Sequence, residues 1–329
     1  MIPSRYRNAV LFALLAVVWG SSFVAIETGL RTLPPVLFAA LRYDIAGGIL
    51  LTVVAVLGFR RDDFQWRPAT RTDWTLVGVG GVFMFGLYLA LFFTGQQYVT
   101  SGVGAVVLSL KPVATPVFAL ALLPNERFDA LEIGGILLAL LGVVVVADPT
   151  SLGGSTVGVG LLLVGSLVFA FASVVTQRLR TTLPALSQQA WMMAVGALVL
   201  HATSAAVRGW PSVSLTRSAA VSLVYLAVVA SIGGYLIYFD LLGRIGANEV
   251  NLVNYAVPVV ATVFGALLLG EPITDATITG FLVIVAGFVL LKRAALKRGV
   301  VAARRPSRSP PGATSSETVV VSGNAYYRG

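Results

Sequence analysis

The side chains most able to do chemistry in this sequence are charges that stand inside long apolar runs. Lys111 lies about ten residues into the run 101–123, and Asp44 lies at a similar depth in the run 35–58. Charge at membrane depth is costly and usually functional. We interpret Lys111 as a site for the anionic group of a substrate and Asp44 as a group for gating or proton coupling. The alternative is a Lys111–Asp44 ion pair that only joins two helices.

Two further charges, Glu27 and Arg42, lie nearer the outer ends of their runs. They are candidates for a gate or for coupling to protons, and they are expected to pair with each other or with Asp44, or to extend to the membrane surface. His201 is a candidate proton relay, although a buried, hydrogen-bonded histidine is the simpler interpretation.

Polar and aromatic residues near the middle of two runs are candidate substrate ligands. Trp19 lies about 15 Å into the run 9–30 at 1.5 Å per residue, which is deeper than the interfacial belt where tryptophan concentrates. It either lines a cavity or fills a gap between small residues. Asn251 and Asn254 are three residues apart, followed by Tyr255. Their amides either bind substrate or hydrogen-bond between helices.

Prolines interrupt two of the apolar runs. Pro112 falls in the run 101–123 and Pro258 in the run 247–269. A proline in a helix interior removes a backbone hydrogen bond and kinks the helix, and a freed carbonyl at membrane depth needs protein or a wet cavity around it. We therefore predict a moving or site-forming role for both prolines, with a static kink as the alternative.

The elements that must position these residues are long apolar segments. Of the 329 residues, 57% are hydrophobic and 11% are charged, whereas a soluble domain carries about 25% charged residues. Each segment has roughly the length that crosses a bilayer as a helix. The sequence therefore predicts an all-α integral membrane protein with ten transmembrane helices, at 9–30, 35–58, 74–95, 101–123, 131–148, 157–176, 187–207, 217–241, 247–269 and 276–292.

The positions of Lys and Arg predict the orientation, because cytoplasmic loops carry an excess of both. With the N-terminus inside, eighteen of them fall in inside segments and three in outside segments. We therefore expect a multi-pass protein of the cell (plasma) membrane with both termini cytoplasmic. The tail 293–329 is rich in Ser, Pro, Gly and Arg, so we expect it to be disordered and to contact anionic lipid rather than nucleic acid.

The sequence also contains a tandem repeat. A shift of 145 residues places the stretch Gly135–Gly142 on Gly280–Gly287 and Glu126 on Glu271, and one residue of slippage places Pro112 on Pro258. We divide the chain into a first five-helix repeat at 1–148 and a second at 149–292. Because five is odd, the second copy is expected to be inverted in the membrane, as in many secondary transporters.

The ordered motifs resemble the drug/metabolite transporter superfamily, and within it the EamA-like family. The similarity covers about residues 9–292 and implies a carrier of amino acids, other metabolites, nucleotide sugars or drugs. The residues that carry it are Trp19-Gly-Ser-Ser-Phe-Val-Ala-Ile, Pro35 with Ala40-Leu-Arg42, Leu110-Lys-Pro112-Val, Leu123-Pro-Asn-Glu126-Arg, Pro258-Val and Leu269-Gly-Glu271-Pro.

We therefore expect a secondary transporter, an exporter of small metabolites such as amino acids that works by alternating access. The alternatives are a multidrug efflux carrier and a non-transporting membrane scaffold. An enzyme is not expected, and no catalytic residues, cofactor or metal are predicted, since the chain has no cysteine and one histidine. The expected partners are a small-molecule solute, lipids and possible coupling protons; the oligomeric state stays open, with a homodimer among the options.

Overall fold

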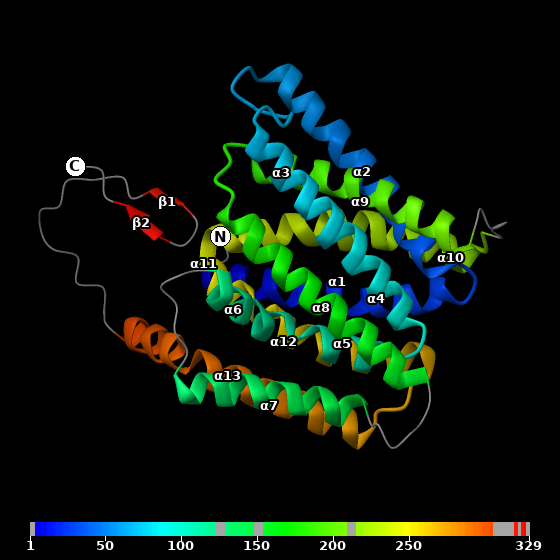
Figure 1. The fold of residues 1–329 in the computed structure, drawn as a ribbon, viewed down its shortest axis with the longest axis vertical. Helices are drawn as coiled ribbons and strands as arrows, with labels where there is room; N and C mark the ends of the chain where they lie inside the picture. The colour runs from blue at the N-terminus through cyan, green and yellow to red at the C-terminus, as the bar shows by residue number, and fades with distance from the viewer. Residues whose placement is uncertain are drawn as a thin grey trace, which may run out of the picture.

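The computed structural model describes residues 4–122, 129–147, 154–208, 215–304, 319–321 and 324–326. The membrane part is helical throughout these ranges (Figure 1). The elements are α1 (Ser4–Leu30), α2 (Pro35–Arg60), α3 (Arg71–Val79), η1 (Gly80–Leu87), α4 (Tyr88–Gln96), α5 (Ser101–Leu108), α6 (Lys111–Leu122), α7 (Ala130–Ala147), α8 (Gly154–Arg178), α9 (Ala185–Arg208), α10 (Arg217–Val224), η2 (Tyr225–Gly233), α11 (Gly234–Val250), α12 (Val253–Phe264), η3 (Gly265–Leu269), α13 (Asp275–Arg304), β1 (Val319–Val321) and β2 (Asn324–Tyr326).

Eight of the described helices are long and apolar enough to cross a membrane, and two more are shorter apolar helices. The eight coincide with the first eight predicted runs. The shorter ones, Val253–Leu269 and Asp275–Leu291, coincide with the ninth and tenth. The prediction of a helical, multi-pass membrane protein is thus confirmed.

Two of the spans contain π-helical segments at corresponding positions. In η1 and η2 the backbone bonds reach one residue further than in an α-helix, which widens the helix and often marks a functional site. The two segments begin 145 residues apart and end 146 residues apart. This spacing equals the shift found from the glycine and proline motifs.

The fourth and ninth apolar runs are each broken by a short turn. Between α5 and α6 the turn is Ser109–Leu110, and between α11 and α12 it is Asn251–Leu252. Pro112 lies in the first turn of α6, where a missing N–H has no consequence, whereas Pro258 lies inside α12. The two prolines therefore differ in local structure despite their matched positions in the sequence.

The helices α7 and α13 lie side by side along one edge of the molecule (Figure 1), and their contact is reciprocal. A β-carbon on Gly135 would lie 2.6 Å from the carbonyl oxygen of Gly287, and one on Gly142 would lie 2.7 Å from that of Gly280. Glycine thus permits the two backbones to touch. By the shift of 145, Gly287 is the counterpart of Gly142, and Gly280 is the counterpart of Gly135. Each of the two glycines of α7 therefore contacts the counterpart of the other, as across a two-fold axis.

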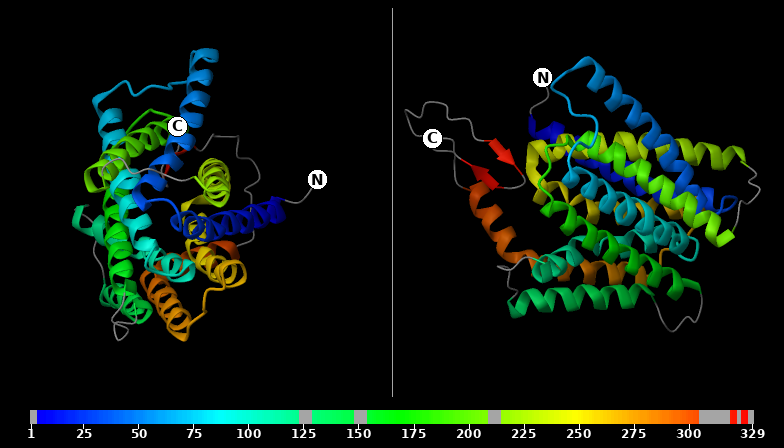
Figure 2. Two further views of the ribbon diagram at one scale, coloured as in Figure 1. Left: turned by 90° about the vertical axis from the view of Figure 1, so that its right-hand side faces the viewer. Right: turned by 45° about the horizontal axis from the view of Figure 1, so that its top comes forward.

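Away from this pair, α2 packs along α9, and α1 packs against α12 and α11 (Figure 2). At one end of α3 the carboxylate of Asp73 accepts hydrogen bonds from the N–H groups of Ala69 and Thr70, both at 3.0 Å, and from the hydroxyl of Thr181. Beyond the far end of this span, at the start of α5, the backbone N–H of Ser101 donates to Glu271. Polar contacts therefore join the two halves at both ends.

The structure differs from the sequence prediction in the tail. Helix α13 continues to Arg304, and β1 pairs with β2 in an antiparallel hairpin. Residues 291–304 are mostly Leu, Ala, Lys, Arg and Val and contain no proline, so they favour continuation of the helix, and the valines of β1 favour a strand. The remaining residues of the predicted tail, 305–318, 322–323 and 327–329, lie outside the described residues.

Candidate functional site

Lys111 is held by three elements. It is the first residue of α6, directly after the turn at Ser109–Leu110. Its ammonium donates a hydrogen bond to the hydroxyl of Tyr88, at the junction of η1 and α4, and lies 4.2 Å from the centre of the Tyr88 ring and 4.7 Å from that of Phe169 in α8. Aromatic faces attract a desolvated cation, so the aromatic groups partly compensate the burial of its charge.

Asp44 does not pair with Lys111, so the alternative of an ion pair that only joins two helices is wrong. Its Oδ2 lies 2.7 Å from Nε2 of His201 in α9. Asp44 faces away from Lys111 because of its position around the axis of α2. Arg42, Tyr43 and Ala46 are buried, whereas Asp44 is exposed on the outer side of the helix next to α9. His201 is thus hydrogen-bonded as the simpler interpretation predicted, but it is partly exposed rather than buried.

Trp19 belongs to an aromatic group at the contact of α1 with η2 and α11. Its Nε1 donates to the carbonyl of Ala230 at 3.2 Å, its ring stacks on Tyr238 at 5.7 Å, and it meets Tyr235 edge-on at 5.9 Å. A β-carbon at Gly234 would lie 2.4 Å from that Nε1, so this glycine makes the room that the indole occupies.

The asparagines join the Trp19 group, but Tyr255 does not. The hydroxyl of Tyr238 donates to Oδ1 of Asn251 at 3.3 Å, and Nδ2 of Asn254 donates to the carbonyl of Asn251 at 2.9 Å. The ring of Tyr255 instead packs on Phe288 of α13 at 4.5 Å, and its buried hydroxyl has no partner among the described residues. Trp19, Asn251 and Asn254 therefore form one connected group.

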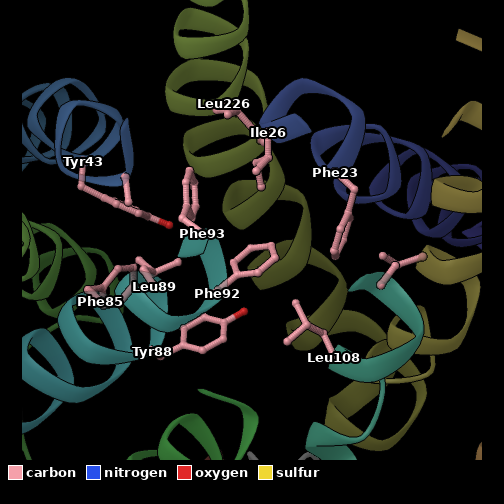
Figure 3. Close-up of a cluster of buried hydrophobic side chains, with 14 of the residues drawn as sticks. Phe23, Ile26, Tyr43, Phe85, Tyr88, Leu89, Phe92, Phe93, Leu108 and Leu226 are labelled. Carbon is pink, nitrogen blue, oxygen red and sulfur yellow. The ribbon is translucent and has the colours of Figure 1, made fainter. Parts of the chain in front are cut away.

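A row of aromatic rings connects the Trp19 helix to Lys111. Phe23, one turn after Trp19 on α1, lies 5.6 Å from Phe92, and Phe92 stacks on Tyr88 at 5.8 Å. Figure 3 shows these rings meeting at the centre of the buried cluster, with the hydroxyl groups of Tyr43 and Tyr88 pointing toward its middle. Phe23 of α1 is thus connected through Phe92 and Tyr88 to the Lys111 ammonium.

Arg42 is buried, with 8% of its surface exposed, and it does not pair with Glu27 or Asp44 as predicted. Its Nε donates to Oγ of Ser231 in η2 at 3.0 Å, and Ser231 in turn donates to the carbonyl of Leu226 at 2.9 Å. The ion pairs of the described residues join other groups: Asp44 with His201, Asp240 with Arg244, and Asp129 with Arg293. Asp240 and Arg244 lie one turn apart on α11, and their ion pair measures 2.7 Å.

Glu27 lies near the end of α1, and its Oε2 is buried without a hydrogen-bond partner among the described residues. Glu271, in contrast, accepts both the backbone N–H and the hydroxyl of Ser101. Its counterpart in the repeat, Glu126, lies outside the described residues. The first and second halves are therefore connected at the start of α5 by one fully engaged carboxylate.

Sequence reasoning missed several partners in this region. Ser231 could have been found as a hydroxyl within a long apolar run, the type of residue that hydrogen-bonds between membrane helices. Ser101 could have been found as a residue at a helix start. Nothing in the sequence distinguishes Phe169 from the other 16 phenylalanines, because its role depends on how α8 packs against α6.

Comparison with known proteins gives a consistent result. The model of the EamA-like transporter family matches residues 7–147 and again residues 156–293. An Escherichia coli (strain K12) protein named "Probable amino-acid metabolite efflux pump" is 29% identical over 296 residues, which cover 86% of this chain and 94% of that protein. An "Uncharacterized transporter" of Archaeoglobus fulgidus is 28% identical over 288 residues, covering 87% and 99%.

A solved structure shares the fold. A crystal structure with 20% sequence identity superposes with a TM-score of 0.61 and covers 90% of this chain and 99% of its own. At this identity the likeness supports the arrangement of the helices.

Proposed function

Because the chain belongs to the EamA-like transporter family, we propose that it is a secondary transporter that exports small metabolites such as amino acids by alternating access. The relatives named as amino-acid metabolite efflux pumps support this substrate class. The substrate would bind in the aromatic core between the Trp19 group and Lys111, with the amides of Asn251 and Asn254 as further hydrogen-bonding groups.

The observation that carries the proposal is the environment of Lys111. Its ammonium contacts a phenol and two aromatic faces, and none of the ion pairs of the described residues includes it. A buried cation without an ionic partner can bind an anionic group of a substrate. The aromatic surroundings would accommodate the apolar part of a small metabolite.

Alternating access is supported by the matching halves. We take 1–148 and 149–292 as inverted five-helix repeats that together give ten spans, because the family model matches twice, the π-helical segments correspond and the glycine contacts of α7 with α13 are reciprocal. Inverted repeats of this kind move against each other around a fixed site. The turns before Lys111 and Val253 would supply the flexible backbone.

We infer the orientation in the membrane from the same arrangement of ten spans. The Asp129–Arg293 pair joins the start of α7 to the end of the tenth span, as expected when both lie on the cytoplasmic side. We propose a plasma-membrane protein with both termini inside, anionic lipid at the basic tail, and protons exchanged through Glu27 or Asp44 if transport is proton-coupled.

Transport in proteoliposomes tests the proposal. Vesicles that contain the purified protein are loaded with a mixture of unlabelled amino acids and diluted into buffer with a labelled amino acid, one at a time. Counterflow of at least one amino acid above protein-free vesicles is expected. If none of the twenty standard amino acids exchanges while the protein is folded, the amino-acid assignment is wrong.

A further inference from the structure

We propose that the guanidinium of Arg42 is the anchoring site for a carboxylate group of the transported solute. The inference rests on the proposed function and assigns the chemical class of ligand that this part of the site takes. Arg42 therefore has a binding role, rather than the gating role that its position in the sequence suggested.

The first support is the burial of a permanent charge. Arg42 is 8% exposed and lies seven residues after Pro35, so its Cα is about 10 Å into the helix at 1.5 Å per residue. Arginine stays protonated in proteins, and a buried cation without a counter-charge is unfavourable. Such a residue is therefore expected to meet an anion at some stage of the working cycle.

The second support is the use of its hydrogen-bond donors. Nε donates to Ser231, and no acceptor for the four N–H groups of Nη1 and Nη2 occurs among the described residues. Ser231 is a neutral partner whose own hydrogen is directed to Leu226 in the π-helical segment. The Ser231 contact therefore fixes one edge of the guanidinium and leaves the other edge available. A planar fork of this kind matches the two oxygens of a carboxylate.

The third support is that none of the ion pairs among the described residues includes Arg42. Asp44, two residues away on α2, lies on the opposite side of the helix with His201. Glu271 accepts hydrogen bonds from Ser101, and Glu27, whose Oε2 is buried without a partner, forms no ion pair with Arg42. The counter-charge of Arg42 is therefore best supplied by the solute.

The position of Arg42 places this anchor beside the aromatic core. Its guanidinium lies 5.1 Å from the ring centre of Tyr43, whose ring meets Phe85 at 5.3 Å and whose hydroxyl points toward the middle of the cluster in Figure 3. A carboxylate on Arg42 would therefore direct the rest of the solute into the core.

The test compares leucine with leucinamide, in which an amide replaces the carboxylate, and adds propionate as a carboxylate without an amine. Thermal unfolding of the full chain in lipid nanodiscs is measured with sodium propionate, L-leucine, L-leucinamide and sodium chloride as probes. Wild-type protein is expected to be stabilised in a saturable way by leucine and propionate, with at least a tenfold weaker response to leucinamide, since a guanidinium forms stronger hydrogen bonds to a carboxylate than to a neutral amide. Arg42→Gln is expected to lose this preference, and Arg42→Lys to keep part of it.

Arg217→Gln is the matched control, because Arg217 is exposed at the start of α10, and it should bind like the wild type. If Arg42→Gln does not fold, Ser231→Ala decides: it keeps the charge but removes the group that orients it, so the preference for leucine over leucinamide should fall. The proposal is overturned if no carboxylate stabilises the wild type. It is equally overturned if Arg42→Gln, or Ser231→Ala in its place, retains the full preference.

Counterflow separates this proposal from the transport proposal. If wild-type vesicles exchange amino acids and the Arg42→Gln variant has the same KM, Arg42 does not anchor the carboxylate. The transport proposal then still stands. Saturable, Arg42-dependent binding of propionate without exchange of any amino acid would support the anchor and refute the transport assignment.

Discussion

Glu271 accepts two hydrogen bonds from Ser101, one from its backbone N–H at 2.9 Å and one from its hydroxyl at 3.0 Å. Ser101 is fully buried and begins α5 in the first half, whereas Glu271 follows the left-handed Gly270 in the second half. A carboxylate at the N-terminus of a helix satisfies free N–H groups and interacts favourably with the helix dipole. This contact joins the two halves at the start of α5.

Ser101→Ala is expected to lower the free energy of unfolding by about 1.5–3 kcal/mol, because it removes a hydrogen bond to a charged acceptor. Thermal or denaturant unfolding in detergent measures the change. Ser218→Ala is the control, since Ser218 is exposed near the start of α10, and it should change stability by less than about 0.5 kcal/mol. Equal effects of the two substitutions would contradict the assigned role of Ser101.

Lys111→Ala is expected to abolish counterflow while the protein still folds, since the substitution removes a cation whose burial is costly. The double variant Lys111→Ala with Asp44→Ala should remain inactive, because Asp44 is paired with His201. Flux is measured in proteoliposomes at equal protein content. Restoration of flux in the double variant would show that Lys111 and Asp44 do interact.

Gly135→Ala is expected to destabilise the protein by about 1–3 kcal/mol through overpacking, because its β-carbon would lie 2.6 Å from the carbonyl oxygen of Gly287. Its neighbour provides the control. A β-carbon at Gly134 meets only Leu290, at 3.9 Å, so Gly134→Ala should stabilise the helix by up to about 1 kcal/mol. The unfolding temperature is measured for both variants, and Gly134→Ala is expected to unfold at a higher temperature than Gly135→Ala. The opposite order would contradict the close contact assigned to Gly135.

The Asp129 carboxylate should make stability depend on pH. The backbone N–H of Glu132, followed by the side chain of Arg293, holds the pKa of Asp129 below its ordinary value of 3.8. A lowered folded-state pKa contributes stability above the unfolded value and loses it as pH falls through the folded value. The unfolding temperature of the wild type should therefore fall more steeply below about pH 4 than that of Asp129→Asn. Parallel curves would contradict this.

Removal of residues 305–329 is expected to leave folding and transport nearly intact, because the family match ends at residue 293 and chain ends outside the packed core tolerate change. Lys292, Arg293, Lys297 and Arg298 remain to hold the orientation. Expression and counterflow of the truncated protein are compared with those of the full chain. Loss of flux at equal expression would assign the tail a role in transport.

The spans could be predicted from the sequence because each is a long apolar run, and hydrocarbon permits few other structures. The position of the π-helical segments could not, since the residues of η1 and η2 are ordinary for a membrane helix. An interruption of the fourth run was predicted at Pro112, but the break lies at Ser109–Leu110, and Pro112 is the second residue of α6.

The partners of the charged residues were the least predictable part of the site. Depth in the membrane placed Lys111 and Asp44 at the same level, yet depth says nothing of the direction in which each side chain points. Asp44 faces His201 because of the phase of α2. Trp19, Asn251 and Asn254 come together as a group, whereas Tyr255, next in sequence, faces α13.

The reciprocal glycine contacts of α7 and α13 are those that two identical subunits form about a two-fold axis, but here both partners belong to one chain. In a pair of identical subunits each substitution appears twice, whereas in a duplicated chain it appears once. One half is then free to change while the other keeps the contact. Lys111 is an example of such a change. Its counterpart by the Pro112–Pro258 alignment is Val257, so the first half contributes a lysine to the core where the second half contributes a valine.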